Sequence, residues 1–110
     1  MISLKEIADR VTACSTPAKI ILFGSRARGD ADLDSDLDLV VIYPQIKDRG
    51  RMMLDIRRAI GSIGVGVDVL VYSEAEVSER HDWSSTALYW ALREGKVLYD
   101  TASVETGAIA

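Results

Sequence analysis

The chain of 110 residues has only one cysteine, Cys14, and one histidine, His81. A single thiol can form neither a disulfide within the chain nor a cysteine-based zinc cluster. A lone histidine without a nearby nucleophile is more often a surface or capping residue than a catalyst. These scarcities argue against a disulfide-stapled secreted fold and favour a reducing, cytoplasmic location.

Long apolar runs and an excess of positive charge are also missing. No segment approaches the roughly 20 apolar residues of a membrane-spanning helix, and the N-terminus lacks the pattern of an export signal. The 13 Lys and Arg against 17 Asp and Glu leave a net charge of −4. General nucleic-acid binding usually leaves a basic footprint instead. We therefore expect no membrane contact and no direct nucleic-acid partner.

Apolar residues make up 48% of the chain, which is enough for one compact core. Their periodicity predicts the following elements: helices over 4–11, 53–63 and 83–93, a short helix opened by a Ser73–Glu76 capping box, and strands over 19–23, 37–43, 65–72 and 96–99. The first two strands are joined by too short a connection for a helical crossover. The sequence thus predicts an α/β domain over residues 1–100, with a small mixed β-sheet flanked by helices, and a flexible tail over residues 101–110.

Gly24 and Ser25 directly follow the first predicted strand. A glycine lets the backbone approach a ligand closely. Ser25 can offer its hydroxyl and N–H at the start of a helical turn, where N–H groups favour an anion. The pair suits a phosphate, although a lone Gly-Ser pair is more often a simple turn with a helix cap.

Three carboxylates accompany this pair. Asp36 and Asp38 begin the second strand, and their spacing places both on one face with Cα atoms roughly 6–7 Å apart. Asp68 interrupts the apolar third strand, where a carboxylate is costly unless it is paired or bound to a metal. Together they predict a site for two Mg²⁺ ions roughly 4 Å apart. Alternatively, Asp36 caps a turn, Asp38 meets an arginine and Asp68 lies on an exposed strand face.

The spacing of these residues resembles a known signature. Gly24-Ser25, ten intervening residues and Asp36-Leu37-Asp38-Leu39 resemble the polymerase-beta-like nucleotidyltransferase superfamily. Residues 24–29 with 35–39, and the closing segment 92–99, are similar to its minimal nucleotidyltransferase branch. The resemblance implies Mg²⁺-dependent transfer of a nucleoside monophosphate from a triphosphate such as ATP, with release of pyrophosphate. Many members of that branch are antitoxins that move AMP onto a tyrosine of a HEPN-type ribonuclease toxin encoded beside them.

The resemblance also implies a role for each residue. Asp36 and Asp38 would bind both metals, while Asp68 would complete the catalytic metal site and help to deprotonate the acceptor hydroxyl. Gly24 and Ser25 would hold the triphosphate. Every residue of this core pattern is present, so nothing in the sequence indicates an inactive enzyme.

The residues between the two motifs have more than one interpretation. Arg26 and Arg28 could neutralise phosphate charge or dock an acceptor, or could instead form surface ion pairs. Asp30, Asp32 and Asp34 alternate as in a calcium loop, but the turn glycine and the bidentate glutamate of an EF-hand are absent at their positions. We expect these three aspartates to form a solvated acidic loop.

Trp83, Ala87, Trp90 and Glu94 follow one line of the last predicted helix. Core packing is the ordinary role of such a line. Aromatic residues are also enriched in interfaces, so a partner-binding patch is the alternative.

The sequence therefore predicts an enzyme that transfers AMP to a protein acceptor, a tyrosine of a partner toxin. One alternative is an antitoxin that neutralises its partner by binding alone. Another is nucleotidyl transfer to a small molecule such as an aminoglycoside, although so short a chain has little wall to enclose one unless a dimer supplies it. Template-directed polymerisation is least expected, because the acidic balance leaves no channel for a duplex.

Overall fold

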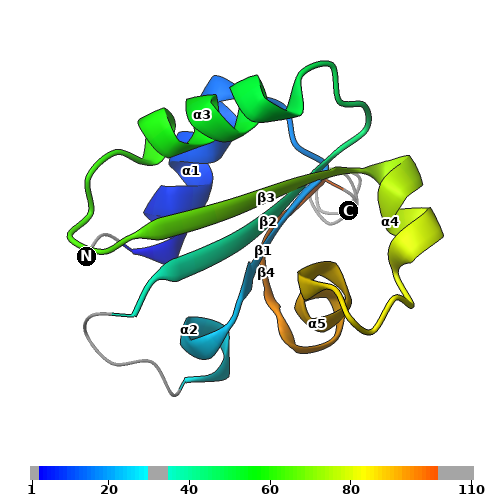
Figure 1. Ribbon diagram of the computed structural model, residues 1–110. Helices are drawn as coiled ribbons and strands as arrows, with labels where there is room; N and C mark the ends of the chain where they lie inside the picture. The colour runs from blue at the N-terminus through cyan, green and yellow to red at the C-terminus, as the bar shows by residue number, and fades with distance from the viewer. Residues whose placement is uncertain (1–2, 30–34, 102–110) are drawn as a thin grey trace, which may run out of the picture.

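A four-stranded sheet forms the centre of the computed structural model, which describes residues 3–29 and 35–101 (Figure 1). Its strands are β1 (Lys19–Phe23), β2 (Leu37–Tyr43), β3 (Val67–Ser73) and β4 (Lys96–Asp100). The spatial order is β3-β2-β1-β4. β1 runs antiparallel to β2 and β4, whereas β2 and β3 are parallel. The predicted mixed sheet is confirmed.

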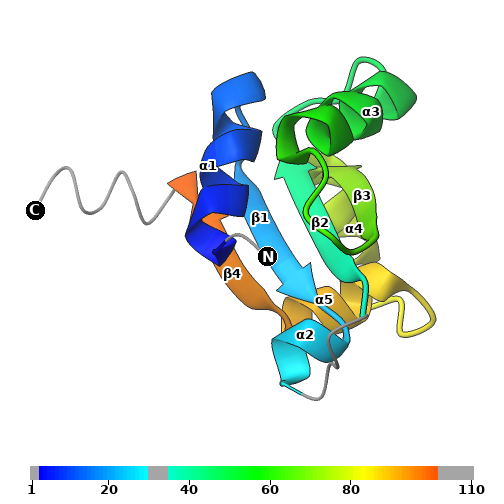
Figure 2. The same ribbon diagram turned by 90° about the vertical axis from the view of Figure 1, so that its left-hand side faces the viewer.

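Helices cover both faces of the sheet. They are α1 (Leu4–Cys14), α2 (Ser25–Arg28), α3 (Arg49–Ile60), α4 (Glu74–Arg80) and α5 (Ala87–Glu94). Figures 1 and 2 show α1 and α3 on one face and α4 and α5 on the other, with α2 beside α5 at one end of the sheet. α3 provides the crossover that the parallel β2–β3 pair requires.

Strand alternation divides the core into two layers. Leu37, Leu39 and Val41 of β2 pack with the buried residues of α1 and α3. Val40 and Ile42 pack on the opposite face with the buried residues of α5. Because successive side chains of a strand point to opposite faces, the even-numbered positions of β2 face α5. The parallel register gives the even-numbered positions of β3 the same direction.

The helix ends follow local capping chemistry. The predicted capping box at Ser73 and Glu76 is present, with each side chain accepting from the other residue's backbone N–H. α3 ends at Ile60, earlier than predicted, because Gly61 follows with a φ of 73°. Ile63 lies beyond this helix but is still part of the core.

The predicted start of the last helix is wrong. Thr86 caps α5 by accepting the N–H of Tyr89, so the helix begins at Ala87 and Trp83 lies before it. The expectation of core packing is also wrong for both tryptophans, since Trp83 and Trp90 are 47% and 49% exposed. Leu88 and Ala91 fill the core from this helix instead.

The end of β4 is anchored. Thr101 donates its N–H to the carbonyl of Ala18 at 3.0 Å. Residues 102–110 and the aspartates of the predicted acidic loop lie outside the described residues, so those two predictions stay untested. Among the helices that the structure describes, none has the length and apolar character needed to cross a membrane.

Candidate active site

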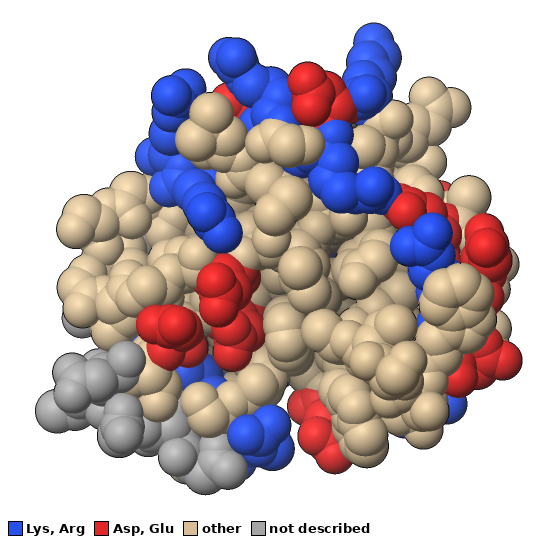
Figure 3. Space-filling model, viewed as in Figure 1, with Lys and Arg blue, Asp and Glu red and all other residues tan. Residues whose placement is uncertain are grey.

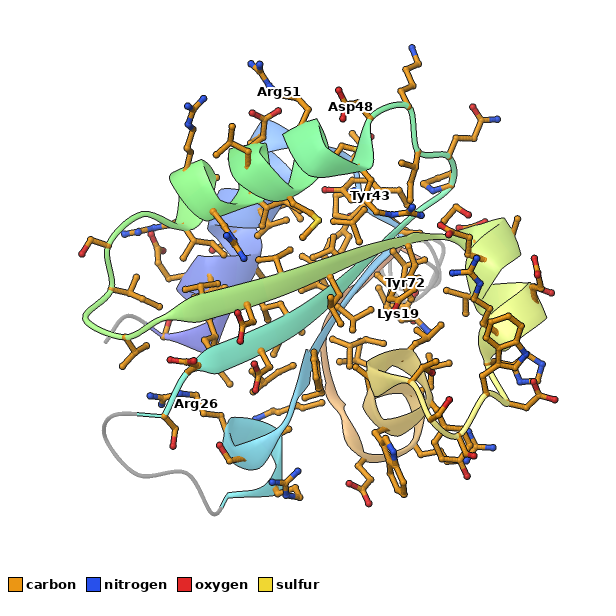
Figure 4. All side chains as sticks on the ribbon, viewed as in Figure 1. Lys19, Arg26, Tyr43, Asp48, Arg51 and Tyr72 are labelled. Carbon is orange, nitrogen blue, oxygen red and sulfur yellow. The ribbon has the colours of Figure 1, made fainter. Side chains whose placement is uncertain are left out.

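The candidate residues come together at one end of the sheet. β1 ends where β2 begins, so the antiparallel register pairs Phe23 with Asp38. The parallel register then pairs Asp38 with Asp68 on β3. Figure 4 shows Arg26 at this end and Tyr43 and Tyr72 toward the other. Residues from three separate stretches of sequence therefore meet in one place.

Gly24 lies against a carboxylate, whereas the predicted approach of its backbone to a ligand stays a prediction. Its φ of 77° is one that side chains rarely adopt. A Cβ at this position would lie 3.3 Å from the Cγ of Asp38 and closer still to its Oδ2. The Asp38 carboxylate thus packs directly on the backbone that precedes α2.

Ser25 is the first residue of α2. Gly24 caps this short helix through its carbonyl, which accepts the N–H groups of Ala27 and Arg28 at 3.1 and 3.2 Å. The first N–H groups of a helix have no partner within the helix. The backbone at Ser25 is therefore suited to an anion held beside Asp38.

Asp36 lies one residue before β2 and is exposed. A Cβ on Gly66 would come within 2.6 Å of its Oδ1, so this carboxylate rests against the segment that leads into β3. The N–H of Leu37 donates to the carbonyl of Gly66 at 2.8 Å in the same place. Gly66 is a residue of the site that sequence reasoning missed, since no motif marks it.

Arg26 connects α2 to the backbone before Asp36. Its Nε and Nη2 donate to the carbonyl oxygen of Ser35 at 3.0 and 2.6 Å. This contact differs from the roles that the sequence suggested, which were a phosphate contact, acceptor docking or a surface ion pair. A guanidinium has five N–H donors, so the contact with Ser35 leaves donors for a phosphate.

The three carboxylates converge in charge as well as in position. The pKa of Asp38 is raised, first by burial, then by the negative charge of Asp68 and a hydrogen bond with it, and then by Asp36. The positive charge of Arg28 opposes this shift. Figure 3 shows acidic atoms gathered at this end of the sheet, between α3 and α2. Asp68 is exposed, as expected for a carboxylate on an exposed strand face. It also interacts with Asp38, as expected for a member of the site.

The donor set fits a hard divalent cation. Carboxylate oxygens are the ligands that Mg²⁺ prefers, and a bound cation would offset the negative charge that Asp68 and Asp36 place beside Asp38. Within residues 3–29 and 35–101, no group of three or more acidic, His or Cys side chains is already arranged as a metal site. Asp38 and Asp68 contact each other instead, and Asp36 rests on Gly66.

A cavity of about 360 Å³ opens beside the Gly24 turn, between α2 and α5; we call it the α2–α5 cavity. It is lined by Phe23, Gly24, Arg28, Ala87, Trp90 and Glu94. The last three share one face of α5, so the predicted helical line is confirmed for them. In the sequence, only this helical spacing indicated that these three residues of α5 lie together. A larger hollow of about 600 Å³, bordered by Pro44 and Arg49, includes none of the candidate site residues.

His81 is exposed and caps the end of α4, as its isolation in the sequence predicted.

Comparison with known proteins agrees with this geometry. Residues 4–104 match the family described as "Nucleotidyltransferase domain". The "Putative protein adenylyltransferase MJ0604" of Methanocaldococcus jannaschii is 35% identical over 82 residues, which cover 74% of this chain and 77% of that protein.

Two solved structures share the fold. One, described as "a putative nucleotidyltransferase from Sulfolobus solfataricus", has 25% identity and a TM-score of 0.60, over 87% of this chain and 76% of that one. The other is a "toxin-antitoxin with AMP-PNP", with 20% identity and a TM-score of 0.57, over 90% of this chain and 74% of that one. At 20% identity, the second likeness supports the fold alone. With the family match spanning nearly the whole chain, this protein belongs to the nucleotidyltransferase domain family and is a nucleotidyltransferase.

Proposed function

We propose that this protein transfers AMP from ATP to a tyrosine hydroxyl of a HEPN-type ribonuclease toxin and thereby acts as its antitoxin. The observation that carries the proposal is the packing of the Asp38 carboxylate on Gly24 and against Asp68. This contact places the turn proposed to bind phosphate directly beside the carboxylates. The name of the relative from Methanocaldococcus jannaschii supports a protein acceptor. The motif resemblance to the minimal nucleotidyltransferase branch, many members of which are antitoxins, points to a toxin as that acceptor.

The transfer can be written from the residues of this chain. The backbone at Gly24 and Ser25 holds the triphosphate by its N–H groups, with Arg26 and Arg28 as further cationic contacts. The acceptor oxygen attacks the α-phosphorus, the bond between that phosphorus and the bridging oxygen breaks, and pyrophosphate leaves. Asp68 takes part in removing the proton of the acceptor hydroxyl.

Asp36, Asp38 and Asp68 would hold the metal. Two Mg²⁺ ions bound there would supply charge neutralisation for the triphosphate and a lowered pKa for the attacking hydroxyl. The pKa of Asp38 is raised first by burial and then by the negative charges of Asp68 and Asp36, and bound cations would offset those charges.

The test is incubation of the purified protein with labelled ATP, Mg²⁺ and the product of a neighbouring toxin-like gene, followed by intact mass of both proteins. We expect AMP units on the partner, absent with Asp38→Asn. If the partner forms a tight complex and is neutralised without gaining AMP, this protein is an antitoxin that acts by binding alone. Transfer only to an added aminoglycoside would point to a small-molecule enzyme.

A further inference from the structure

We propose that the α2–α5 cavity holds the nucleobase of the donor nucleotide, and that the indole of Trp90 is the surface on which the base stacks. This inference rests on the proposed function and deepens it, because it assigns the residue that recognises the nucleoside part of the substrate.

The cavity is continuous with the phosphate-binding turn. Gly24 belongs to the turn and Arg28 to α2, the helix that follows it, and both residues line the cavity. α2 and α5 lie side by side in both ribbon views (Figures 1 and 2). A nucleotide whose phosphates rest on the turn can therefore extend its base toward α5 without leaving the protein surface. The volume of about 360 Å³ falls in the usual range for ligand pockets, roughly 300–1,000 Å³.

Trp90 is both exposed and held in place. It is 49% exposed, so one part of the indole is open to a ligand. Its ring meets the ring of Tyr89 edge-on, with centroids 5.0 Å apart and planes at 82°. The guanidinium of Arg93 lies 3.8 Å from the centroid of Tyr89 and fixes that ring in turn. An aromatic ring that is ordered before the ligand arrives loses less entropy on binding, and nucleobases commonly stack on such rings.

Trp83 provides an internal comparison. It is 47% exposed, almost as much as Trp90, and its ring is covered by Arg80 at 5.4 Å. It borders a different cavity of about 60 Å³, which is too small for a base and includes neither Gly24 nor Arg28. Exposure alone therefore does not distinguish the two tryptophans, whereas position relative to the phosphate turn does.

Glu94 adds a preference among bases. Its carboxylate lines the same cavity, and an ionised carboxylate only accepts hydrogen bonds. It therefore favours a base that presents an exocyclic amino group, such as adenine, over uracil, which presents carbonyl oxygens and a single ring N–H.

Two variants that each retain one tryptophan test the stacking. In Trp83→Phe the only indole is that of Trp90, and in Trp90→Phe it is that of Trp83. With Mg²⁺ present, we expect ATP to quench the fluorescence of Trp83→Phe and to leave that of Trp90→Phe unchanged. Inorganic tripolyphosphate, which has no base, should bind both variants without quenching either.

Calorimetry measures how much Trp90 contributes to the affinity for ATP. We expect Trp90→Ala to raise the Kd for ATP about tenfold, in line with the loss of one base–aromatic stack, and to leave the Kd for tripolyphosphate unchanged. Trp90→Phe should retain most of the affinity, since it keeps an aromatic face. Wild-type protein should bind ATP more tightly than UTP, and Glu94→Gln should reduce that ratio.

These measurements distinguish failure of the stacking role of Trp90 from failure of the proposed nucleotidyl transfer. If wild-type protein does not bind tripolyphosphate with Mg²⁺, or if Asp38→Asn binds it as well as wild type, the proposed function fails. If tripolyphosphate binds in an Asp38-dependent way but Trp90→Ala leaves the Kd for ATP unchanged, the base lies elsewhere and only the stacking role of Trp90 is overturned. An equal loss of ATP and tripolyphosphate affinity in Trp90→Ala would overturn it too, because that is a general disturbance of the site.

Discussion

The carboxylate of Asp38 lies on the backbone of Gly24, where a Cβ would come within 3.3 Å of its Cγ. The contact joins the end of β1 to the start of β2 and depends on the antiparallel register that pairs Phe23 with Asp38. The absence of a side chain at position 24 thus serves two purposes. It permits the positive φ of the turn, and it leaves room for the Asp38 carboxylate beside the turn that we propose to bind the phosphates.

Gly24→Ala should therefore abolish most nucleotidyl transfer. The new methyl group would displace the Asp38 carboxylate, and a misplacement of about 1 Å at a catalytic group can cost on the order of 100-fold in rate. The control is Gly29→Ala. Gly29 also has a positive φ, 83°, but a Cβ there would meet nothing within 4 Å. Both variants should lose about 1–2 kcal/mol of stability, and only Gly24→Ala should lose activity. Equal activity of the two at a temperature where both are folded would show that the Gly24–Asp38 contact is unimportant.

Gly66→Ala should lower activity without lowering stability. Its φ lies outside the left-handed region, so the backbone is not strained by a side chain, but the methyl group would push the Asp36 carboxylate away. We expect roughly a tenfold loss of activity at limiting Mg²⁺ and an unchanged or slightly raised free energy of unfolding. Gly64→Ala should show the opposite pattern, since Gly64 has a φ of 89° and no neighbour within 4 Å. Urea denaturation measures the stability of both variants, and Mg²⁺ titration measures their activity. Gly66→Ala should lose only activity and Gly64→Ala only stability.

The sequence predicted the centre of this site because its determinants are local. Gly24, Ser25, Asp36 and Asp38 lie on one short stretch, and strand periodicity places Asp38 on the α5 side of the sheet. The expectation that Asp36 also belongs to this strand is wrong, because β2 begins at Leu37. The sheet could also be predicted, since the connection between β1 and β2 is too short for an ordinary helical crossover and therefore favours a mixed sheet over a purely parallel one. The position of Asp68 could not be derived from local spacing, because its pairing with Asp38 depends on the register of two strands joined through α3.

Other contacts between distant segments could not be predicted. The position of Asp36 against Gly66 arises from the packing of a loop, and glycine leaves no periodic signal there. The beginning of α5 was missed because Trp83 keeps the helical spacing, while the actual start is set by the hydrogen bond of Thr86 to Tyr89. The α2–α5 cavity forms only when β1 and α5 pack together.

Arg26→Ala should raise the Mg²⁺ concentration that half-maximal activity requires. Without its two hydrogen bonds to Ser35, the backbone before Asp36 is less well fixed. We expect a several-fold shift in the Mg²⁺ dependence, with kcat largely recovered at saturating Mg²⁺ and the KM for ATP little changed. Arg26→Lys should recover part of the effect, because an ammonium group can still donate to a carbonyl. A large rise in the KM for ATP that Mg²⁺ does not relieve would indicate a direct phosphate contact instead.

Glu76 should make part of the stability of the fold depend on pH. Its pKa is lowered, first by the backbone N–H of Ser73 and then by Arg49, against the opposing effect of burial. A carboxyl group whose pKa is lowered on folding stabilises the native state above its unfolded pKa, and that contribution disappears as the pH falls through the lowered value. Glu76→Ala should therefore lower the free energy of unfolding by about 1 kcal/mol at pH 7, and the difference from wild type should shrink in acid below the ordinary pKa of glutamate.

Ser73→Ala is the control. It removes the other half of the capping box without removing a titrating group, so the stability that it loses should change less with pH. Urea denaturation of the three proteins from pH 7 to pH 3 measures this. A gap between wild type and Glu76→Ala that stays constant across that range would mean that the charge of Glu76 contributes nothing and that its role is packing alone.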